Sequence, residues 1–163
     1  MEADAAFVPD GFEPPLRLAT AEFVLEPLGS QHNERDYEAW TSSIDHILAT
    51  PGFRGAAWPS AMTLAENLED LEKHARDFVE RRGFTYTVLD PATSDVIGCV
   101  YIYPVRQGDA CAAGSRGGRP SASIRSWVSA DRACLDEGLR SLVTHWLESD
   151  LPFEIVDYAS RHR

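Results

Sequence analysis

The segment Phe84-Thr85-Tyr86-Thr87-Val88-Leu89 is followed by a turn, Asp90 to Asp95, and then by Val96-Ile97-Gly98-Cys99-Val100-Tyr101-Ile102-Tyr103. Both segments are rich in β-branched and aromatic residues, and Asp, Pro, Thr and Ser fill the turn, which is the pattern of a β-hairpin. The second segment is apolar at successive positions, so it should lie in a sheet that is covered on both faces. The sequence therefore predicts an α/β domain built around this strand pair.

Further elements are predicted on both sides of the hairpin, because apolar residues recur at helical spacing and short apolar runs lie between them. Thr63 and Glu66 form a capping box at the start of the clearest helix. We expect strands at residues 23–28, 122–129 and 153–158, and helices from Asn33 to before Pro51, from Thr63 to before Gly83 and from Leu135 to near Pro152. One domain, residues 21–158, contains all of them.

The segments outside this pattern differ in composition. Residues 1–20 contain Pro9, Pro14 and Pro15, which suits an extended arm. Residues 105–120 hold arginines scattered among four glycines. No strand and helix flank them tightly enough for a phosphate-binding loop, so we expect a flexible connection. Residues 159–163 form a short tail.

The balance of charge limits the classes of partner. The 163 residues include 15 Lys and Arg against 26 Asp and Glu, which gives a formal net charge of −11. A negative protein repels phosphate backbones and anionic lipids, so we expect neither nucleic acid nor a membrane as a partner. The charge either serves solubility alone or favours a cationic small molecule, and composition leaves both alternatives open.

Cysteine and histidine usage bears on compartment and metals. Cys99, Cys111 and Cys134 lie far apart, and their odd number argues against a closed disulfide framework. The first residues lack the pattern of a signal peptide, and no later apolar run is long enough to cross a bilayer. The five histidines show no spacing typical of a metal site, so we predict no bound metal. Together these observations predict a cytoplasmic protein.

Several short segments carry a resemblance to a known family: Asn33-Glu34-Arg35-Asp36-Tyr37, Ala39-Trp40-Thr41-Ser42-Ser43, Gly83 to Val88 and Asp95-Val96-Ile97-Gly98. With the order of elements, they resemble the GNAT N-acetyltransferase superfamily, in a bacterial branch of undefined substrate. The resemblance implies an α/β (α+β) fold with a central mixed sheet, mostly antiparallel, flanked by helices and truncated at the C-terminus. It also implies a splayed parallel pair between the fourth and fifth strands.

The same resemblance implies an N-acyltransferase that moves an acetyl or other acyl group from CoA to a small amine. The residues implied in binding acetyl-CoA or another acyl-CoA are Trp127, Val128, Ser129, Arg132, Gly138 and Arg140. The sequence departs from the family at the pyrophosphate loop, where Ala133 replaces the usual Gln or Arg and Asp136 replaces a glycine. Asp136 and Glu137 also place two carboxylates where an anion would bind, which weakens anion binding. Without a ligand, the same carboxylates simply stabilise the first turn of a helix.

The catalytic groups and the acceptor pocket are less defined. No carboxylate lies on the fourth strand, where the family often carries its general base. The candidates for proton transfer are Tyr101, Tyr158, His46 and Asp45, although packed tyrosines and an ordinary helix surface explain them equally well. The candidates for the acceptor pocket are Trp40, Phe53 and Trp58, of which the last two lie in a loop that is either packed or offered to a ligand.

Two further interpretations remain open. Because the pyrophosphate loop is altered, the chain could be a catalytically inactive GNAT-like binding or regulatory module. The last predicted strand, residues 153–158, ends the sheet, and an unpaired edge of this kind favours a homodimer.

Overall fold

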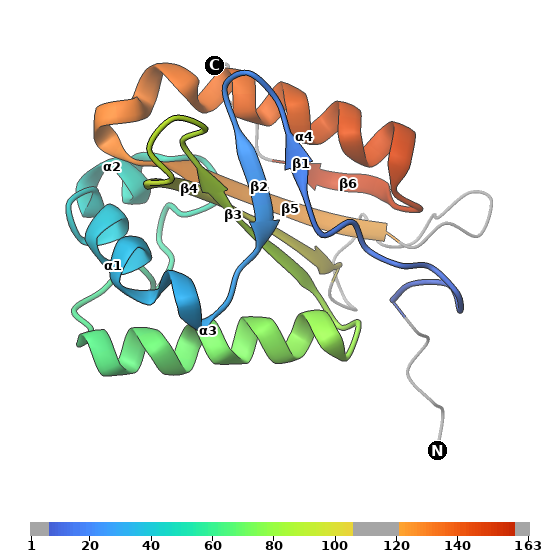
Figure 1. The fold of residues 1–163 in the computed structure, drawn as a ribbon, viewed down its shortest axis with the longest axis horizontal. Coiled ribbons are helices and arrows are strands. Elements are labelled where there is room, and N and C mark those ends of the chain that lie inside the picture. Colours follow the sequence, from blue (N-terminus) through green and yellow to red (C-terminus); the bar gives the residue numbers. More distant parts are fainter. Residues whose placement is uncertain (1–6, 106–120, 159–163) are drawn as a thin grey trace.

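The computed structural model of the protein describes residues 7–105 and 121–158 (Figure 1). Most of the loop predicted at residues 105–120 and the tail at residues 159–163 therefore lie outside the described residues. No helix in the described ranges is long and apolar enough to cross a membrane.

A single six-stranded sheet organises the fold, and its strands follow one another in the order of the sequence (Figure 1). The strands are β1 (Leu18–Ala19), β2 (Val24–Pro27), β3 (Phe84–Leu89), β4 (Val96–Pro104), β5 (Ser121–Val128) and β6 (Glu154–Tyr158). The hairpin predicted at the centre is confirmed as β3 and β4, whose pairing runs from Phe84 with Ile102 to Leu89 with Val96.

The numbering of the parallel pair requires a correction. The sequence predicts this pair between the fourth and fifth expected strands, residues 122–129 and 153–158, which are β5 and β6 in the structure; β5 and β6 are parallel, whereas β4 and β5 are antiparallel. The count shifts because the short β1, which pairs with β2, lies within the segment expected to be an extended arm. β6 forms one edge of the sheet, and a dimer through this edge stays a prediction.

Helices cover both faces of the sheet, which gives three layers (Figure 1). One face carries α1 (Asn33–Thr41), α2 (Ile44–Ala49) and α3 (Leu64–Val79), and the other carries α4 (Asp136–Asp150). Short 3₁₀ turns, η1 (Ser30–His32) and η3 (Ala130–Leu135), precede α1 and α4. Two apolar clusters fill the spaces between the layers, one beneath α4 and one beneath α1 to α3. The sheet is therefore buried on both faces, as its apolar central strands require.

The single helix predicted from Asn33 to before Pro51 is two helices. The backbone at Ser43 leaves the helical region, with φ −130° and ψ 18°. The buried hydroxyl of Ser43 accepts a hydrogen bond from the Ala130 N–H at 2.9 Å. This contact with a distant segment turns the chain between α1 and α2, which local apolar spacing cannot predict.

The helix predicted to start at Thr63 is confirmed, and so is its capping box with Glu66. Its inward face differs from the expected apolar stripe, because Leu64 and Val79 are exposed. Asn67 and Leu71 are buried instead, and the side chain of His74 is 16% exposed. These three positions repeat at spacings of four and three, so polar residues occupy part of the face that meets the sheet.

The first described residues pack on the core. Phe7 and Val8 are buried, and the Phe7 ring stacks on Phe153 with 4.8 Å between ring centroids. The Phe7 ring also stacks on Phe84, with 6.0 Å between centroids. The start of the chain thus contacts both β3 and the segment that leads into β6.

Gly98 allows β4 and β5 to approach each other closely. A Cβ atom at this position would lie inside van der Waals contact of the Trp127 carbonyl oxygen. Any side chain here would therefore push β5 away from β4, which explains the glycine of the Val96-Ile97-Gly98 segment.

Candidate functional site

A cavity of about 700 Å³ opens on the face of the sheet that carries α3. Its walls come from α3, from the loop between α2 and α3, and from β4 and β5. The lining residues are Phe53, Ala56, Ala57, Trp58, Met62, Asp70, Lys73, His74, Tyr101, Tyr103, Pro104, Val105, Ser123 and Arg125. A cavity of this volume with aromatic walls and a few converging polar groups is typical of a small-molecule site.

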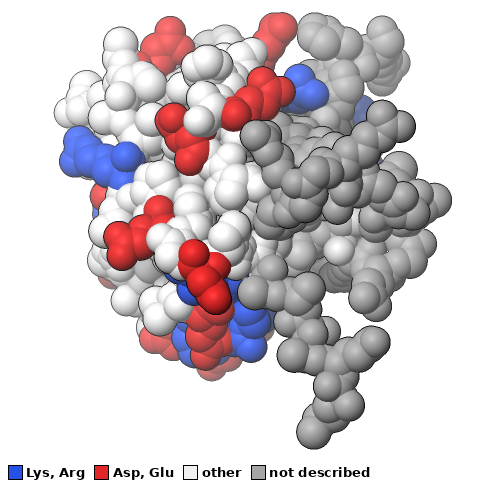
Figure 2. All heavy atoms as spheres, turned by 90° about the vertical axis from the view of Figure 1, so that its right-hand side faces the viewer, with Lys and Arg blue, Asp and Glu red and all other residues white. Residues whose placement is uncertain are grey.

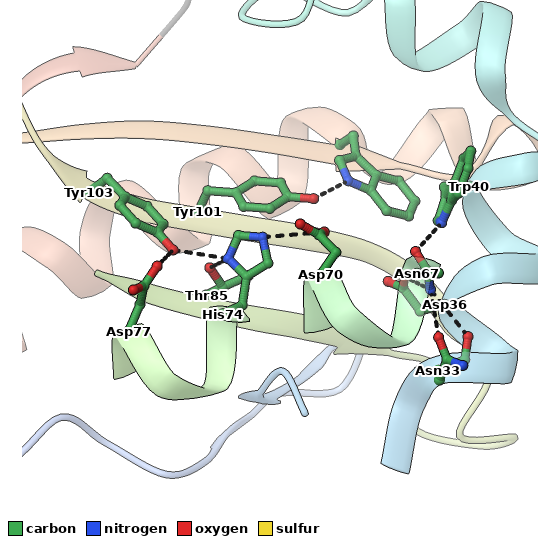
Figure 3. A network of polar contacts seen from close by, with 11 residues as sticks. Asn33, Asp36, Trp40, Asn67, Asp70, His74, Asp77, Thr85, Tyr101 and Tyr103 are labelled. Carbon is green, nitrogen blue, oxygen red and sulfur yellow. Dashed lines mark hydrogen bonds and ion pairs between the residues drawn. The ribbon is translucent and has the colours of Figure 1, made fainter. Parts of the chain in front are cut away.

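His74 makes polar contacts through both of its ring nitrogens at this cavity (Figure 3). Its Nδ1 atom lies 2.9 Å from the Tyr103 hydroxyl and 3.0 Å from the Thr85 hydroxyl. The Tyr103 hydroxyl donates its proton to Asp77 at 2.9 Å, so its oxygen is available to accept from Nδ1–H. A neutral ring with its proton on Nδ1 fits these contacts and leaves Nε2 as an acceptor, while the other tautomer, in which Nδ1 accepts from Thr85 and Nε2–H faces Asp70, fits them as well.

The Nε2 atom of His74 faces a carboxylate. It lies 3.5 Å from Asp70 Oδ2, one helical turn earlier on α3 (Figure 3). In the tautomer with its proton on Nδ1, the ring and the carboxylate are two acceptors at this distance, which favours a proton or a cation between them. The pair can therefore bind an ammonium group or take up a proton from one.

Tyr101 lines the same cavity, but its hydroxyl faces inward. The oxygen accepts a hydrogen bond from Trp127 Nε1 at 3.1 Å (Figure 3). Desolvation by burial raises the pKa of Tyr101 well above its ordinary value. The phenol therefore keeps its proton at neutral pH.

β5 presents an uncovered edge over its second half. Ser121 to Ile124 pair with β6, whereas Arg125 to Val128 pair only with β4 among the described strands. The N–H of Ser129 donates to Ile97 on the β4 side at 2.9 Å. Since N–H groups alternate in direction along an antiparallel strand, the N–H of Val128 points to the opposite side. Val128 thus offers a backbone donor where β6 does not extend.

The turn η3, which precedes α4, lies beside a smaller cavity of about 200 Å³, whose walls include Ser129, Asp131 and Arg132. Ser129 is buried, and its hydroxyl donates to Asp131 at 2.7 Å. The N–H of Ala130 is held by Ser43, and the N–H of Arg132 donates to the Ser129 carbonyl. Several donors of this turn are therefore already used within the protein.

The charged residues predicted to hold a phosphate have other partners. Arg132 forms an ion pair with Asp90 at 2.9 Å. The pKa of Asp90 is lowered mainly by the hydrogen bond that the Ala92 N–H donates to it, and Arg132 lowers it further. Arg140 donates to the Tyr158 carbonyl at 3.1 Å and lies over the Tyr158 ring. Gly138 faces Phe23 and Glu22.

The other candidates for proton transfer lie away from the cavity. The Tyr158 hydroxyl is 2.6 Å from Ser126 Oγ, and the Tyr158 ring packs against the apolar cluster beneath α4. Asp45 and His46 lie on α2 and line a shallow hollow next to Ala130. The structure thus places only Tyr101 of the four at the cavity.

The predicted acceptor-pocket residues divide into two groups. Phe53 and Trp58 line the cavity and also pack into the cluster beneath α1 to α3, and their role in an acceptor pocket stays a prediction. Trp40 lies behind Trp58, with 5.5 Å between ring centroids, and donates through Nε1 to Asn67 at 3.0 Å. Trp40 thus supports the wall rather than forming it.

The sequence did not predict Asp70, Lys73, His74 or Arg125 as site residues. For His74 a signal was present in the spacing of Asn67, Leu71, His74 and Phe78, which places two polar residues in one apolar stripe.

Charged side chains are scattered over the described part of the face that Figure 2 shows. On this face acidic side chains predominate among the charged residues (Figure 2). The few Lys and Arg side chains form no continuous basic surface there. The described residues include no group of three or more His, Cys, Asp or Glu side chains that could hold a metal ion.

Comparisons with known proteins give structural matches only. No protein-family model and no curated protein matches the sequence. A candidate ribosomal-protein-serine acetyltransferase from Vibrio cholerae superimposes with a TM-score of 0.60 at 15% identity, over 88% of this chain and 75% of that one. A protein from Bordetella pertussis assigned to the GNAT family gives 0.53 at 18% identity, over 82% and 72%. The chain has the GNAT fold.

Solved structures with the GNAT fold include complexes with the acyl donor. The Microcin C7 self-immunity acetyltransferase MccE, in complex with acetyl-CoA and AMP, matches with a TM-score of 0.54 at 13% identity, over 83% of this chain and 69% of that one. Donor binding in that structure is a property of MccE. The GNAT fold of the present chain, predicted from the hairpin and its flanking segments, is confirmed.

Proposed function

We propose that the protein is an N-acyltransferase that moves an acetyl or other acyl group from CoA to a small amine. The observation that carries this proposal is the position of the uncovered edge of β5 beside a cavity that holds an Asp70–His74 pair. The edge of β5 can receive a thioester, and the cavity can receive an amine. Trp127 on β5 connects the two, because its Nε1–H donates to Tyr101, which lines the cavity.

The backbone of β5 would bind the reacting carbonyl. A thioester carbonyl gains negative charge when an amine attacks it, and a fixed N–H donor stabilises that charge. The Val128 N–H is directed to the side where no described strand competes for it. This role depends on the backbone alone, so it requires no particular side chain.

The amine must lose a proton during the reaction. Attack by its lone pair forms the C–N bond and breaks the C–S bond, and the amine proton moves to a base. With the ring proton on Nδ1, His74 Nε2 is the acceptor at the cavity, and Asp70 stabilises the imidazolium that results. The thiolate that leaves is protonated by solvent.

A melting experiment with acetyl-CoA tests this function. A ligand that binds the folded state raises the melting temperature, and a concentration 100 times its Kd stabilises the protein by about 2.7 kcal/mol. We expect a saturable rise with acetyl-CoA. His74→Gln should retain this rise while losing acyl transfer, and Glu72→Gln, an exposed position on α3, should retain both. The absence of any rise at millimolar acetyl-CoA would contradict the proposal.

A second candidate function is a binding module with the GNAT fold that does not use CoA. The specific observation in its favour is that Arg132 and Arg140 are engaged by Asp90 and Tyr158, while Ser43 holds the Ala130 N–H. In this case acetyl-CoA leaves the melting temperature unchanged, whereas a ligand of the large cavity raises it.

A further inference from the structure

The charged side chains that line the cavity of about 700 Å³ indicate the chemical class of its ligand more closely than the presence of an amine alone. Besides two tyrosines, four ionisable side chains line it: Asp70, Lys73, His74 and Arg125. The first three lie within two turns of α3, and Arg125 comes from β5. The cavity therefore combines a site for a cation with a site for an anion.

The cation site is the Asp70–His74 pair. Nε2 and the carboxylate lie 3.5 Å apart, and the ring is held by Tyr103 and Thr85 on its other nitrogen. An ammonium group can donate to both acceptors at once. Hydrogen bonds from an ammonium group to a carboxylate are charge-assisted and therefore strong.

The anion site involves Lys73 and Arg125. The Arg125 guanidinium lies 5.2 Å from the centre of the Phe53 ring and 5.6 Å from that of Tyr101. Stacking uses the faces of the guanidinium and leaves its N–H edges free to bind a carboxylate in a bidentate manner. Neither Arg125 nor Lys73 forms an ion pair with a described carboxylate, although the protein has an excess of acidic residues.

The remaining wall is aromatic and apolar. Phe53, Trp58 and Met62 line it together with the Tyr101 ring. An apolar wall of this kind binds an apolar side chain and disfavours a strongly polar one.

We propose that the cavity binds a small amino-carboxylate, such as a free α-amino acid with an apolar side chain, with its carboxylate at Arg125 and Lys73 and its amine at Asp70 and His74. This inference rests on the proposed function, because it names the acceptor of that reaction. It differs from acceptance of a protein N-terminus, whose first residue has no free carboxylate.

Direct binding without acetyl-CoA tests the inference by itself. Titration calorimetry would compare L-phenylalanine, phenylalaninamide and phenethylamine, which share a ring and an amine but of which only the first has a carboxylate. We expect phenylalanine to bind at least about tenfold more tightly than the other two, which corresponds to about 1.4 kcal/mol. Equal or tighter binding of phenylalaninamide would overturn the inference and point to a peptide N-terminus instead.

Matched variants locate the carboxylate. Arg125→Gln and Lys73→Gln should each weaken phenylalanine binding about tenfold and leave phenethylamine binding unchanged. Arg125→Lys keeps the charge and should retain part of the affinity. Arg76→Gln, on the same helix but not in the cavity wall, is the control. Unchanged phenylalanine binding in both Gln variants, with circular dichroism showing that they fold, would refute the assignment.

The two proposals fail separately. If acetyl-CoA raises the melting temperature but phenylalanine has no advantage over its amide, the acyltransferase stands and the amino-carboxylate inference falls. If phenylalanine binds through Arg125 and acetyl-CoA has no effect, the cavity assignment stands and the acyltransferase falls.

Discussion

Replacement of Asp36 by asparagine should make the protein more stable at neutral pH. Asp36 lies on α1 with a side chain that is 5% exposed, and Asn67 donates to its Oδ2 at 3.1 Å (Figure 3). Burial is the largest cause that raises the pKa of this carboxyl from 3.8 to about 6, and the bond from Asn67 opposes it. The ionised form is therefore disfavoured in the folded protein.

The sign of the pH dependence follows from this pKa. The folded state binds the Asp36 proton more tightly than the unfolded state, so the free energy of unfolding falls as pH rises between about 4 and 6 and is level above about 7. A difference of about two pKa units corresponds to about 3 kcal/mol, of which about 2 kcal/mol is lost between pH 4 and pH 7.5. Asparagine cannot ionise, and its amide oxygen can accept the same bond from Asn67.

The assay is urea unfolding of the wild type and of Asp36→Asn at several pH values from 4 to 7.5. The difference between the two proteins isolates Asp36 from all other titrating groups, and we expect it to grow by about 2 kcal/mol in favour of the variant as pH rises. Asp45→Asn, at an exposed position of α2, is the control. A difference that is constant over this range would refute the argument that burial of Asp36 opposes its ionisation.

Three further substitutions test features of the fold. Gly98→Ala should lower the free energy of unfolding by about 1–3 kcal/mol, because its methyl group meets the facing strand. Gly138→Ala should be tolerated, because its methyl group would lie 3.7 Å from the nearest atom of Glu22. Equal effects of the two substitutions in urea unfolding would contradict this reading. Ser43→Ala should cost about 1–3 kcal/mol by leaving a backbone N–H without its acceptor, while Ser42→Ala, at an exposed position, should cost less in thermal unfolding. Phe7→Ala should cost about 3 kcal/mol if the first residues belong to the core, and an unchanged urea midpoint would show that they do not.

The hairpin and the capped helix α3 could be predicted because their signals are local. Alternating β-branched residues and a short turn specify a strand pair, and Thr63 with Glu66 specifies a helix start. The break between α1 and α2 could not be predicted, since it depends on a bond from Ser43 to Ala130, which lies 87 residues later.

The candidate site was harder to predict than the fold for the same reason. His74 gains its role from Tyr103 and Thr85, which lie on two neighbouring strands. The loop that carries Phe53 and Trp58 could be identified as aromatic, but only its packing shows which side faces a cavity. Tyr101 could be predicted because successive side chains of a strand point to opposite faces of the sheet, which fixes the face on which each side chain lies.

The stacking of Phe7 on Phe153 has a consequence for the order in which the chain folds. Each strand of the sheet pairs with the strand that precedes it in the sequence, so the sheet can grow stepwise while the chain is being synthesised. The contact of Phe7 with Phe153 departs from this order, because its partner belongs to one of the last described segments. Phe7 can stack on Phe84 earlier, but its contact with Phe153 can form only after synthesis has passed Phe153. This part of the core is therefore completed later than the central hairpin, and until then the Phe7 side chain lacks one of its two stacking partners.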